Sequence, residues 1–290
     1  MKYQALEKYL ARLNGSVREE SRVWLDAEGR AQGKYFNTTL TSAFQPIRVF
    51  GSGSGSTAIA DAGIVAHEGF ARSYSEDDSG LHLWRLLDQA ASDDESIELD
   101  RLCRMLHSIN FYRQVEDNVS LHLSVHARLL AAVDSNHGIA FRRILNMLEL
   151  PHEQIVLQMP VVTQNQRWLL NYVLDNYRRN GFKLGISAAD ARDALALLEK
   201  VKPDLIKVDA REITDEQSTE KLLRIAGEQD IRVVFKRVEN PVVFAKLQAF
   251  GQALALPVYA QGYLWDTPKS TLAAPVVQVS APSHAETRVA

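Results

Sequence analysis

Eight short apolar runs, rich in β-branched and aromatic residues, recur along the middle of the chain and constrain its fold more than any other feature. Between most of them lie segments with Leu and Ala at three-to-four spacing, such as RWLLNYVLDNYRRNG and DARDALALLEKV, which predict helices. The predicted strands are residues 43–50, 59–72, 120–126, 155–160, 182–187, 205–209, 232–238 and 255–262. Strands alternating with helices over about 230 residues are typical of a (β/α)8 barrel, an α/β fold.

The first two predicted strands depart from this alternation. They are joined only by GSGSGST, residues 51–57, which is too short for a crossover helix. We therefore expect them to form an antiparallel hairpin. No helix follows the glycines, so we expect a flexible turn or an engineered link and not a phosphate-binding loop.

The two ends of the chain differ from the middle and suggest three regions. Residues 1–38 predict a short helix followed by a hairpin that turns at Glu28 and Gly29; this extension is either a dimerisation arm or a packing cover. Residues 39–268 form the predicted barrel. Residues 269–290 mix Ala, Pro, Ser and Thr without periodicity and predict a flexible tail.

Composition excludes several classes of partner. The 290 residues include 33 basic and 36 acidic side chains, a formal charge of -3, so nothing points to nucleic acid or an anionic membrane surface. The N-terminus lacks the apolar core of a signal peptide and no run is long enough to span a membrane, so we expect a cytoplasmic protein. The single cysteine, Cys103, has the helical spacing of a buried core residue and excludes a disulfide within the chain.

Polar side chains recur near the carboxyl ends of the predicted strands, where barrels of this kind carry their sites. Because side chains alternate between the faces of a strand, each set shares one face. The inward-facing sets are Glu68, Phe70 and Arg72; His122 and Ser124; Val156, Gln158 and Pro160; Gly185 and Ser187; Leu205, Lys207 and Asp209; and Val234, Lys236 and Val238. A lysine on a buried face, as predicted for Lys236, requires an anionic partner.

Seven stretches resemble, in order and spacing, the motifs of the EAL-domain phosphodiesterases, which hydrolyse cyclic di-GMP with two divalent metal ions. The resemblance covers about residues 40–268. FQPIRVF resembles YQPIV, HEGFAR resembles EALLR, LHLSVHARLL resembles VNLSARQL, and IVLQMPVV resembles LVLEITES. LIKVDAREI is similar to LKIDRSFV, VVFKRVEN to VVAEGVET, and VYAQGYLWDTP to YVQGYLFSRP. The resemblance implies an EAL-type barrel.

The motif residues that bind metal in this family are mostly replaced here. Glu68 is kept, but the family's asparagine ligand corresponds to His122 and its next glutamate to Gln158. The aspartate pair of the DDFG motif corresponds to Ser187 and Ala188, and the glutamate of VVAEGVET to Lys236. Around the aspartate pair a small shift would bring Asp190 or Asp193 into the site instead.

The matched positions therefore form a basic site. One carboxylate, Glu68, faces Arg72, Lys207 and Lys236, and two dications placed there would be repelled by these charges. We predict a vestigial site without catalytic residues, metal or cofactor, made of Glu68, Arg72, His122, Gln158, Ser187, Lys207 and Lys236.

A zinc site is the alternative, since His67, His122 and His126 are available. However, His67 lies on the opposite strand face from Glu68, and His126 follows the strand end. No H-x-x-x-H or cysteine cluster supports such a site.

Two functions follow from the resemblance and its departures. The first is a catalytically inactive EAL-like domain that acts as a regulatory, protein-binding module in bacterial signalling, with an unidentified regulatory protein as its partner. The alternative is a metal-independent receptor that binds cyclic di-GMP without hydrolysis through Gln45, Arg72, Lys207, Lys236 and Gln261. Against this alternative, Thr267 replaces the arginine of the SRP motif and the DDFG loop is missing. Residual hydrolysis is a third hypothesis. The resemblance also implies a homodimer.

Overall fold

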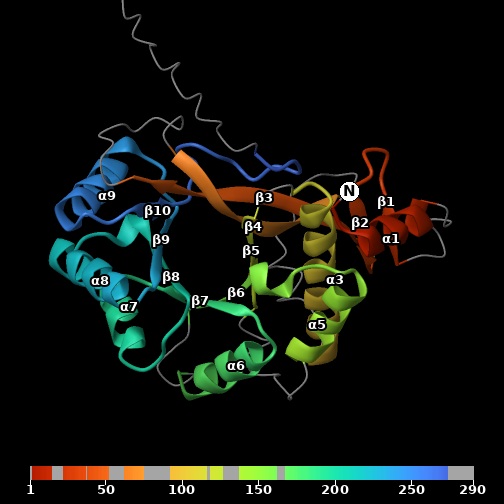
Figure 1. Ribbon diagram of the computed structural model, residues 1–290, viewed down its shortest axis with the longest axis horizontal. Coiled ribbons are helices and arrows are strands. Elements are labelled where there is room, and N and C mark those ends of the chain that lie inside the picture. The colour runs from red at the N-terminus through yellow and green to blue at the C-terminus, as the bar shows by residue number, and fades with distance from the viewer. Residues whose placement is uncertain are drawn as a thin grey trace, which may run out of the picture.

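The computed structural model describes residues 2–14, 22–36, 38–51, 62–74, 92–115, 118–126, 137–161 and 167–273. Its ten strands form one sheet in the order β1-β2-β3-β10-β9-β8-β7-β6-β5-β4, and β3 also pairs with β4. Eight strands thus close into a barrel (Figure 1), which confirms the predicted fold class. The barrel strands are β3 (Thr38–Phe50), β4 (Ala62–Tyr74), β5 (Ser120–Ser124), β6 (Ile155–Met159), β7 (Lys183–Ala188), β8 (Leu205–Asp209), β9 (Arg232–Lys236) and β10 (Val258–Ala260).

The predicted antiparallel hairpin at the start of the barrel is confirmed. β3 is antiparallel to both β4 and β10, whereas all other neighbouring barrel strands are parallel. β3 and β4 each contain 13 residues, and β3 begins before its predicted start because its first residues pair with β2 and with the end of β4. The register aligns Gln45 with Glu68. The glycine-serine segment falls mostly in residues 52–61, outside the described residues.

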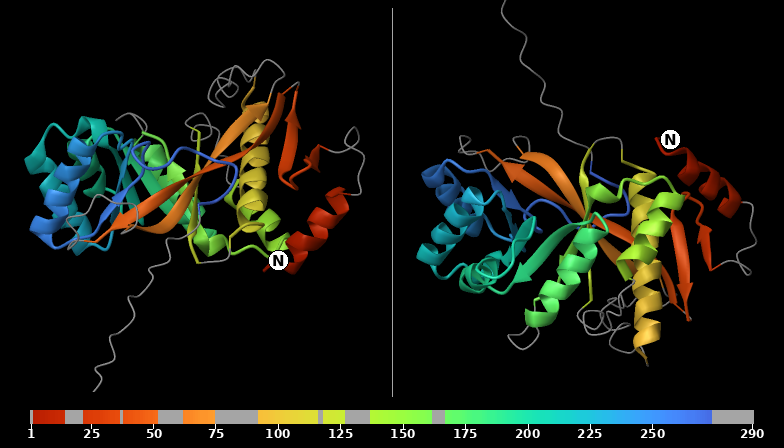
Figure 2. Two further views of the ribbon diagram at one scale, coloured as in Figure 1. Left: turned by 90° about the horizontal axis from the view of Figure 1, so that it is seen from above. Right: turned by 60° about the horizontal axis from the view of Figure 1, so that its bottom comes forward.

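Helices cover the outside of the barrel (Figures 1 and 2). They are α3 (Asp93–Tyr112), α5 (His137–Met147), α6 (Arg167–Arg179), α7 (Ala191–Leu198), α8 (Glu216–Glu228) and α9 (Pro241–Leu254), with short 3-10 turns at His152–Gln154 and Ala210–Glu212. Several begin at a side chain that caps the backbone: Asp190 before α7, Asp215 before α8 and Asn240 before α9. Because each of these three helices follows a parallel strand, its N-terminus lies at the carboxyl end of the barrel.

The N-terminal extension packs against the barrel as an added edge of the sheet. It comprises α1 (Gln4–Asn14), β1 (Val23–Leu25) and β2 (Ala31–Tyr35), and the hairpin turns over Asp26–Gly29, as predicted. Asn110 of α3 holds this hairpin with its side-chain amide, which accepts from the backbone N–H of Ala31 (2.7 Å) and donates to its carbonyl oxygen (2.8 Å). The extension is therefore joined to α3 through its hairpin.

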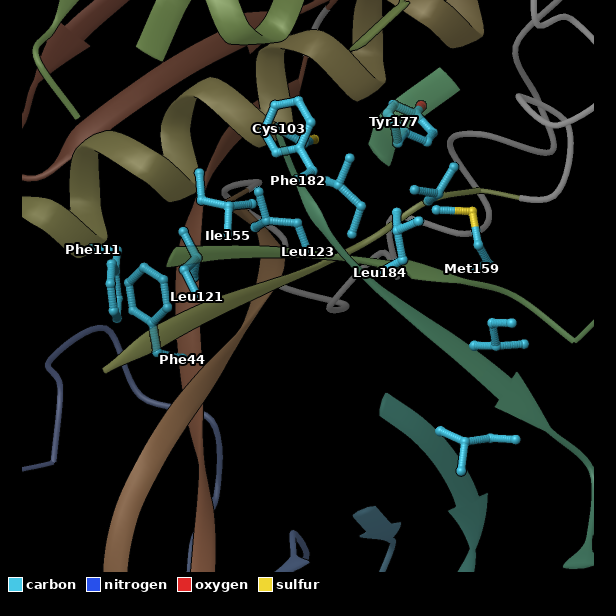
Figure 3. Close-up of a cluster of buried hydrophobic side chains, with 14 of the residues drawn as sticks. Phe44, Cys103, Phe111, Leu121, Leu123, Ile155, Met159, Tyr177, Phe182 and Leu184 are labelled. Carbon is cyan, nitrogen blue, oxygen red and sulfur yellow. The ribbon is translucent and has the colours of Figure 1, made fainter. Parts of the chain in front are cut away.

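The apolar core has two layers. The larger layer fills the space between the strands and the surrounding helices and includes Phe44, Phe111, Leu121 and Cys103 (Figure 3). Cys103 is buried, as predicted, and burial raises the pKa of its thiol. The smaller layer lies inside the barrel and consists of Ile47, Ala66, Val156, Leu205 and Val234.

After the barrel the chain returns to its first strand. Lys269 pairs with Phe44 through two backbone hydrogen bonds, and the backbone N–H of Leu272 donates to the Gln114 side chain. Residues 274–290, most of the predicted tail, lie outside the described residues. Among the residues with described structure, no helix is long and apolar enough to cross a membrane.

Candidate functional site

The barrel interior becomes polar toward the carboxyl ends of its strands. Val234 and Leu205 belong to the apolar inner layer, and the next inward-facing residues along their strands are Lys236 and Lys207. Glu68 follows Ala66 in the same way on β4. The predicted alternation of faces is therefore observed, and a polar layer lies directly above the apolar one.

Glu68 and Lys207 form an ion pair at the centre of this layer. The Lys207 Nζ lies 2.9 Å from the Glu68 Oε2, and the two side chains are 1% and 11% exposed. Ser124 Oγ donates to the other carboxylate oxygen at 3.2 Å. Burial alone would raise the pKa of the Glu68 carboxyl, but Lys207, with help from Gln261 and Ser124, holds that pKa below its usual value. The Glu68 carboxylate is thus ionised and already neutralised by Lys207.

Gln158 and Ser187 form a hydrogen bond between neighbouring strands. The Gln158 Nε2 donates to the Ser187 Oγ at 3.1 Å, and both side chains are buried. A Cβ atom at Gly185 would overlap Oε1 of Gln158, so the glycine on β7 provides the space that this amide occupies. Two positions matched to family carboxylates therefore form a neutral hydrogen bond.

His122 is fully enclosed within the barrel. It is 1% exposed, and neither ring nitrogen has a hydrogen-bond partner among the described residues. Burial, reinforced by the charges of Lys207 and Arg232, lowers its pKa well below the ordinary value, so the imidazole is neutral. Its register neighbour on β4 is Glu68, which places it next to the ion pair.

At the rim, four charged residues lie at the ends of β8 and β9. Arg211 binds Asp209 in a bidentate manner, with its Nε 3.0 Å from Oδ1 and its Nη2 2.9 Å from Oδ2. The Nη1 of Arg237 reaches the same Oδ2 at 2.9 Å. Lys236 is half-buried beside them and makes no hydrogen bond or ion pair with any described residue.

Of the two lysines predicted to face Glu68, Lys207 forms the ion pair and Lys236 does not. The register of the two strands explains the difference, because Lys207 pairs with Val234 on β9, whereas Lys236 lies two residues further along β9, opposite Asp209 and nearer the rim. Partial burial and the adjacent Arg237 lower the pKa of Lys236, although Glu68 partly offsets them. Sequence reasoning also missed Arg237, for which the replacement of the family's glycine in VVAEGVET was the available signal.

The other predicted contacts are spread around the mouth. Gln45 donates through Nε2 to the carbonyl oxygen of Asp266 at 2.7 Å. Gln261 is 2% exposed and favours the charged form of Glu68, although its amide does not reach hydrogen-bonding geometry. Arg72 is exposed near the end of β4 and is not joined to Glu68. The site therefore gathers around Glu68, with Arg72 outside it.

Two alternatives from the sequence find no support among the described side chains. Asp190 caps α7 by accepting from the Asp193 backbone, and Asp193 accepts from the backbone N–H of Ala189, so neither serves as a barrel ligand. His67 packs beside Phe111 on the outer side of the strands. Across the parts of the chain that are described, no group of three or more His, Cys, Asp or Glu could hold a metal ion.

A family model described as "EAL domain" matches residues 33–268, most of the chain. The chain belongs to the EAL domain family. The match begins within β2, so α1 and β1 of this EAL domain precede the matched region. No curated protein sequence matches the chain.

Solved EAL structures share the fold at low sequence identity. BlrP1 of Klebsiella pneumoniae, in a manganese and cyclic di-GMP complex, is 19% identical with a TM-score of 0.65, over 80% of this chain and 57% of that chain. YkuI of Bacillus subtilis, with cyclic di-GMP and calcium, is 18% identical with a TM-score of 0.64, over 82% and 57%. The FimX EAL domain of Pseudomonas aeruginosa, bound to cyclic di-GMP, is 18% identical with a TM-score of 0.61, over 80% and 91%. This chain thus spans little more than half of the BlrP1 and YkuI chains.

The residues of the barrel interior do not fit a pair of divalent metal ions. Mg²⁺ and Mn²⁺ favour oxygen ligands, chiefly carboxylates. Here Glu68 is bound by an ammonium, Gln158 is hydrogen-bonded to Ser187, and Lys236 adds a positive charge. A dication at Glu68 would have to displace Lys207 and would gain no second carboxylate from Gln158, Ser187 or Lys236.

Proposed function

We propose that this EAL domain does not hydrolyse cyclic di-GMP and acts as a regulatory, protein-binding module. The observation that carries the proposal is the buried hydrogen bond between Gln158 and Ser187, because these two neutral side chains occupy positions matched to family carboxylates. Hydrolysis of a phosphodiester by metal-bound water requires the ions that those carboxylates bind. The framework around the site nevertheless remains a closed barrel, which suits a domain retained for binding.

The hydrolysis part of the proposal is tested with cyclic di-GMP and Mn²⁺ or Mg²⁺, with linear dinucleotide measured by chromatography. We expect no product above the level of a Glu68→Ala control. Product that depends on metal and disappears in that control would contradict the proposal.

The protein-binding part is tested by cross-linking the intact protein in its native cytoplasm and identifying captured proteins by mass spectrometry. A partner is accepted only if it rebinds the purified domain with a measurable Kd. If no captured protein rebinds, this part of the proposal fails.

A second candidate function, metal-independent binding of cyclic di-GMP, is favoured by Lys236. This ammonium is half-buried at the barrel mouth and has no ion pair among the described residues, as would suit a phosphate group. One BlrP1 structure holds cyclic di-GMP with no metal ions, so binding without metal occurs in a protein of this fold. Calorimetry with cyclic di-GMP in EDTA tests the candidate: micromolar binding unchanged by EDTA would support it, and no binding at millimolar ligand would exclude it.

A further inference from the structure

The backbone at Arg237 adopts a conformation that disfavours an arginine. Its φ is 60°, in the left-handed region where a Cβ atom crowds the neighbouring carbonyl group. The following residue, Val238, is held to the segment after β10 by two backbone hydrogen bonds, from its own N–H to the carbonyl of Gln261 and from the N–H of Leu264 to its carbonyl. A Cβ atom at Gly262 would overlap the Val238 backbone, so the two loops are in close contact. The chain therefore has to make this turn, and glycine would make it with less strain.

The contact with Asp209 does not account for an arginine at this position. Asp209 already receives two hydrogen bonds from the Arg211 guanidinium and one from the Arg211 backbone N–H, and the bidentate side-chain pairing neutralises the carboxylate. Arg237 adds one more hydrogen bond to the same oxygen, and its side chain stays 53% exposed. The positive charge of Arg237 is thus not required to neutralise Asp209.

Arg237 stands next to a second surplus cation. Lys236 precedes it in the chain, is half-buried, and forms no ion pair with any residue that the structure describes, although Glu68 and Asp209 act on its charge at longer range. Glu239 lies two residues further on and forms no ion pair with either side chain. Two adjacent like charges repel each other at a site with restricted solvent, and an anion between them would remove that repulsion.

We infer that Lys236 and Arg237 form an anion clamp at the carboxyl end of β9, which binds a phosphate group of a nucleotide without metal. Lys236 supplies the charge from inside the mouth, and Arg237 supplies the remaining donors of its guanidinium from the rim. The inference rests on the second candidate function and names the residues that would replace the metal ions as phosphate partners.

Arg237→Gly is the decisive variant, because glycine suits the backbone at this position and the fold should be retained. We expect it and Lys236→Met each to weaken cyclic di-GMP binding in EDTA by roughly tenfold or more, the range for loss of a charge-assisted hydrogen bond. Asp230→Gly is a matched control, since Asp230 also has a left-handed φ of 57° but lies before β9, at the opposite end of the barrel. Arg192→Gln, which removes an arginine paired with Asp215 at the start of α7, controls for net charge.

Titration with inorganic phosphate, followed by ³¹P line broadening, separates the clamp from the receptor function. If wild-type protein binds phosphate but not cyclic di-GMP, and Arg237→Gly abolishes phosphate binding, the clamp stands and the receptor function fails. If cyclic di-GMP binds but phosphate does not, and Arg237→Gly and Lys236→Met each weaken cyclic di-GMP binding, the clamp and the receptor function both stand. The clamp is overturned if neither anion binds, or if both anions bind Arg237→Gly as tightly as they bind Asp230→Gly.

Discussion

The ammonium group of Lys207 lies 2.9 Å from a carboxylate oxygen of Glu68 inside the barrel, with both side chains almost fully shielded from water. Removing one member of a buried pair leaves the other charge uncompensated, which typically costs about 3–5 kcal/mol, whereas replacing both with apolar groups costs far less. We therefore expect Lys207→Met to lower the free energy of unfolding by that amount at pH 7, and Lys207→Met with Glu68→Met to lower it much less. Urea denaturation of the two variants measures the difference.

The same pair predicts a pH dependence with a defined sign. In the wild-type protein the pKa of Glu68 is lowered on folding, so its contribution to stability is present above the pKa of the unfolded state and is lost as the pH falls through the folded value. In Lys207→Met the carboxyl group is buried alone and its pKa should rise. The destabilisation caused by Lys207→Met should therefore shrink between pH 7 and pH 4. An equal penalty at both pH values would mean that Glu68 is not held by Lys207 in solution.

His107 provides a separate test of burial. Its ring lies 2.8 Å from the hydroxyl group of Ser42, and burial lowers its pKa to about 3. The folded state thus keeps a neutral imidazole, and stability is lost as the pH falls below about 6.5, where the unfolded chain gains a proton. For one such histidine the loss between pH 7 and pH 5 is about 2 kcal/mol.

We expect the free energy of unfolding of His107→Gln to fall less than that of the wild type between pH 7 and pH 5, because the variant lacks this histidine. The variant will nevertheless be less stable than the wild type at pH 7. The measurement is the free energy of unfolding in urea at both pH values for wild type and variant. An unchanged difference between pH 7 and pH 5 in the variant would contradict a neutral, buried His107.

The barrel was predictable because its determinants are local and repeated. Apolar runs of strand length, alternating with helical spacing, specify most of the strands, and the short link after residue 50 specifies the antiparallel start. The inward faces followed from strand alternation, and Val234 and Leu205 indeed lie inside the barrel. Strand ends were less accurate, since the predicted segment 255–262 contains only the three-residue strand Val258–Ala260 and begins directly after the end of α9.

The partners of the charged residues were harder to predict. Two lysines face inward, and which of them reaches Glu68 depends on the register between neighbouring strands of the closed barrel. No local sequence pattern encodes that register. The role of Arg237 was hidden for a similar reason, because its left-handed backbone and its shared contact with Asp209 arise only when β8, β9 and β10 are assembled. A sequence therefore indicates which charges face inward more readily than which of them meet.

If the site has lost its metal ligands by substitution, restoring them should restore metal binding. The restored variant carries five changes: His122→Asn, Gln158→Glu, Ser187→Asp, Ala188→Asp and Lys236→Glu. Together with Glu68, the four introduced acidic residues would give the site five carboxylates, and the Lys236 ammonium would be absent. We therefore expect calorimetry to detect Mn²⁺ binding in the variant and none in the wild type. Lys236→Glu alone should not suffice, because Gln158 and Ser187 remain neutral. Wild-type protein that binds Mn²⁺ as tightly as the restored variant would refute the proposed loss of the site.

The strain at Arg237 predicts an unusual effect on stability. An arginine at φ 60° lowers the free energy of unfolding by about 1 kcal/mol relative to glycine. The half-exposed contact between Arg237 and Asp209 contributes less stability than that, because Arg211 already binds the carboxylate and solvent screens the pair. Arg237→Gly should thus leave the free energy of unfolding unchanged or raise it by up to about 1 kcal/mol, as should Asp230→Gly. Thermal and urea unfolding of both variants provide the measurement. A loss of more than about 2 kcal/mol confined to Arg237→Gly would mean that the guanidinium is a structural element of the mouth, because binding residues are dispensable for folding. A more stable variant that no longer binds anions would show that this chain retains Arg237 at a cost to its own stability.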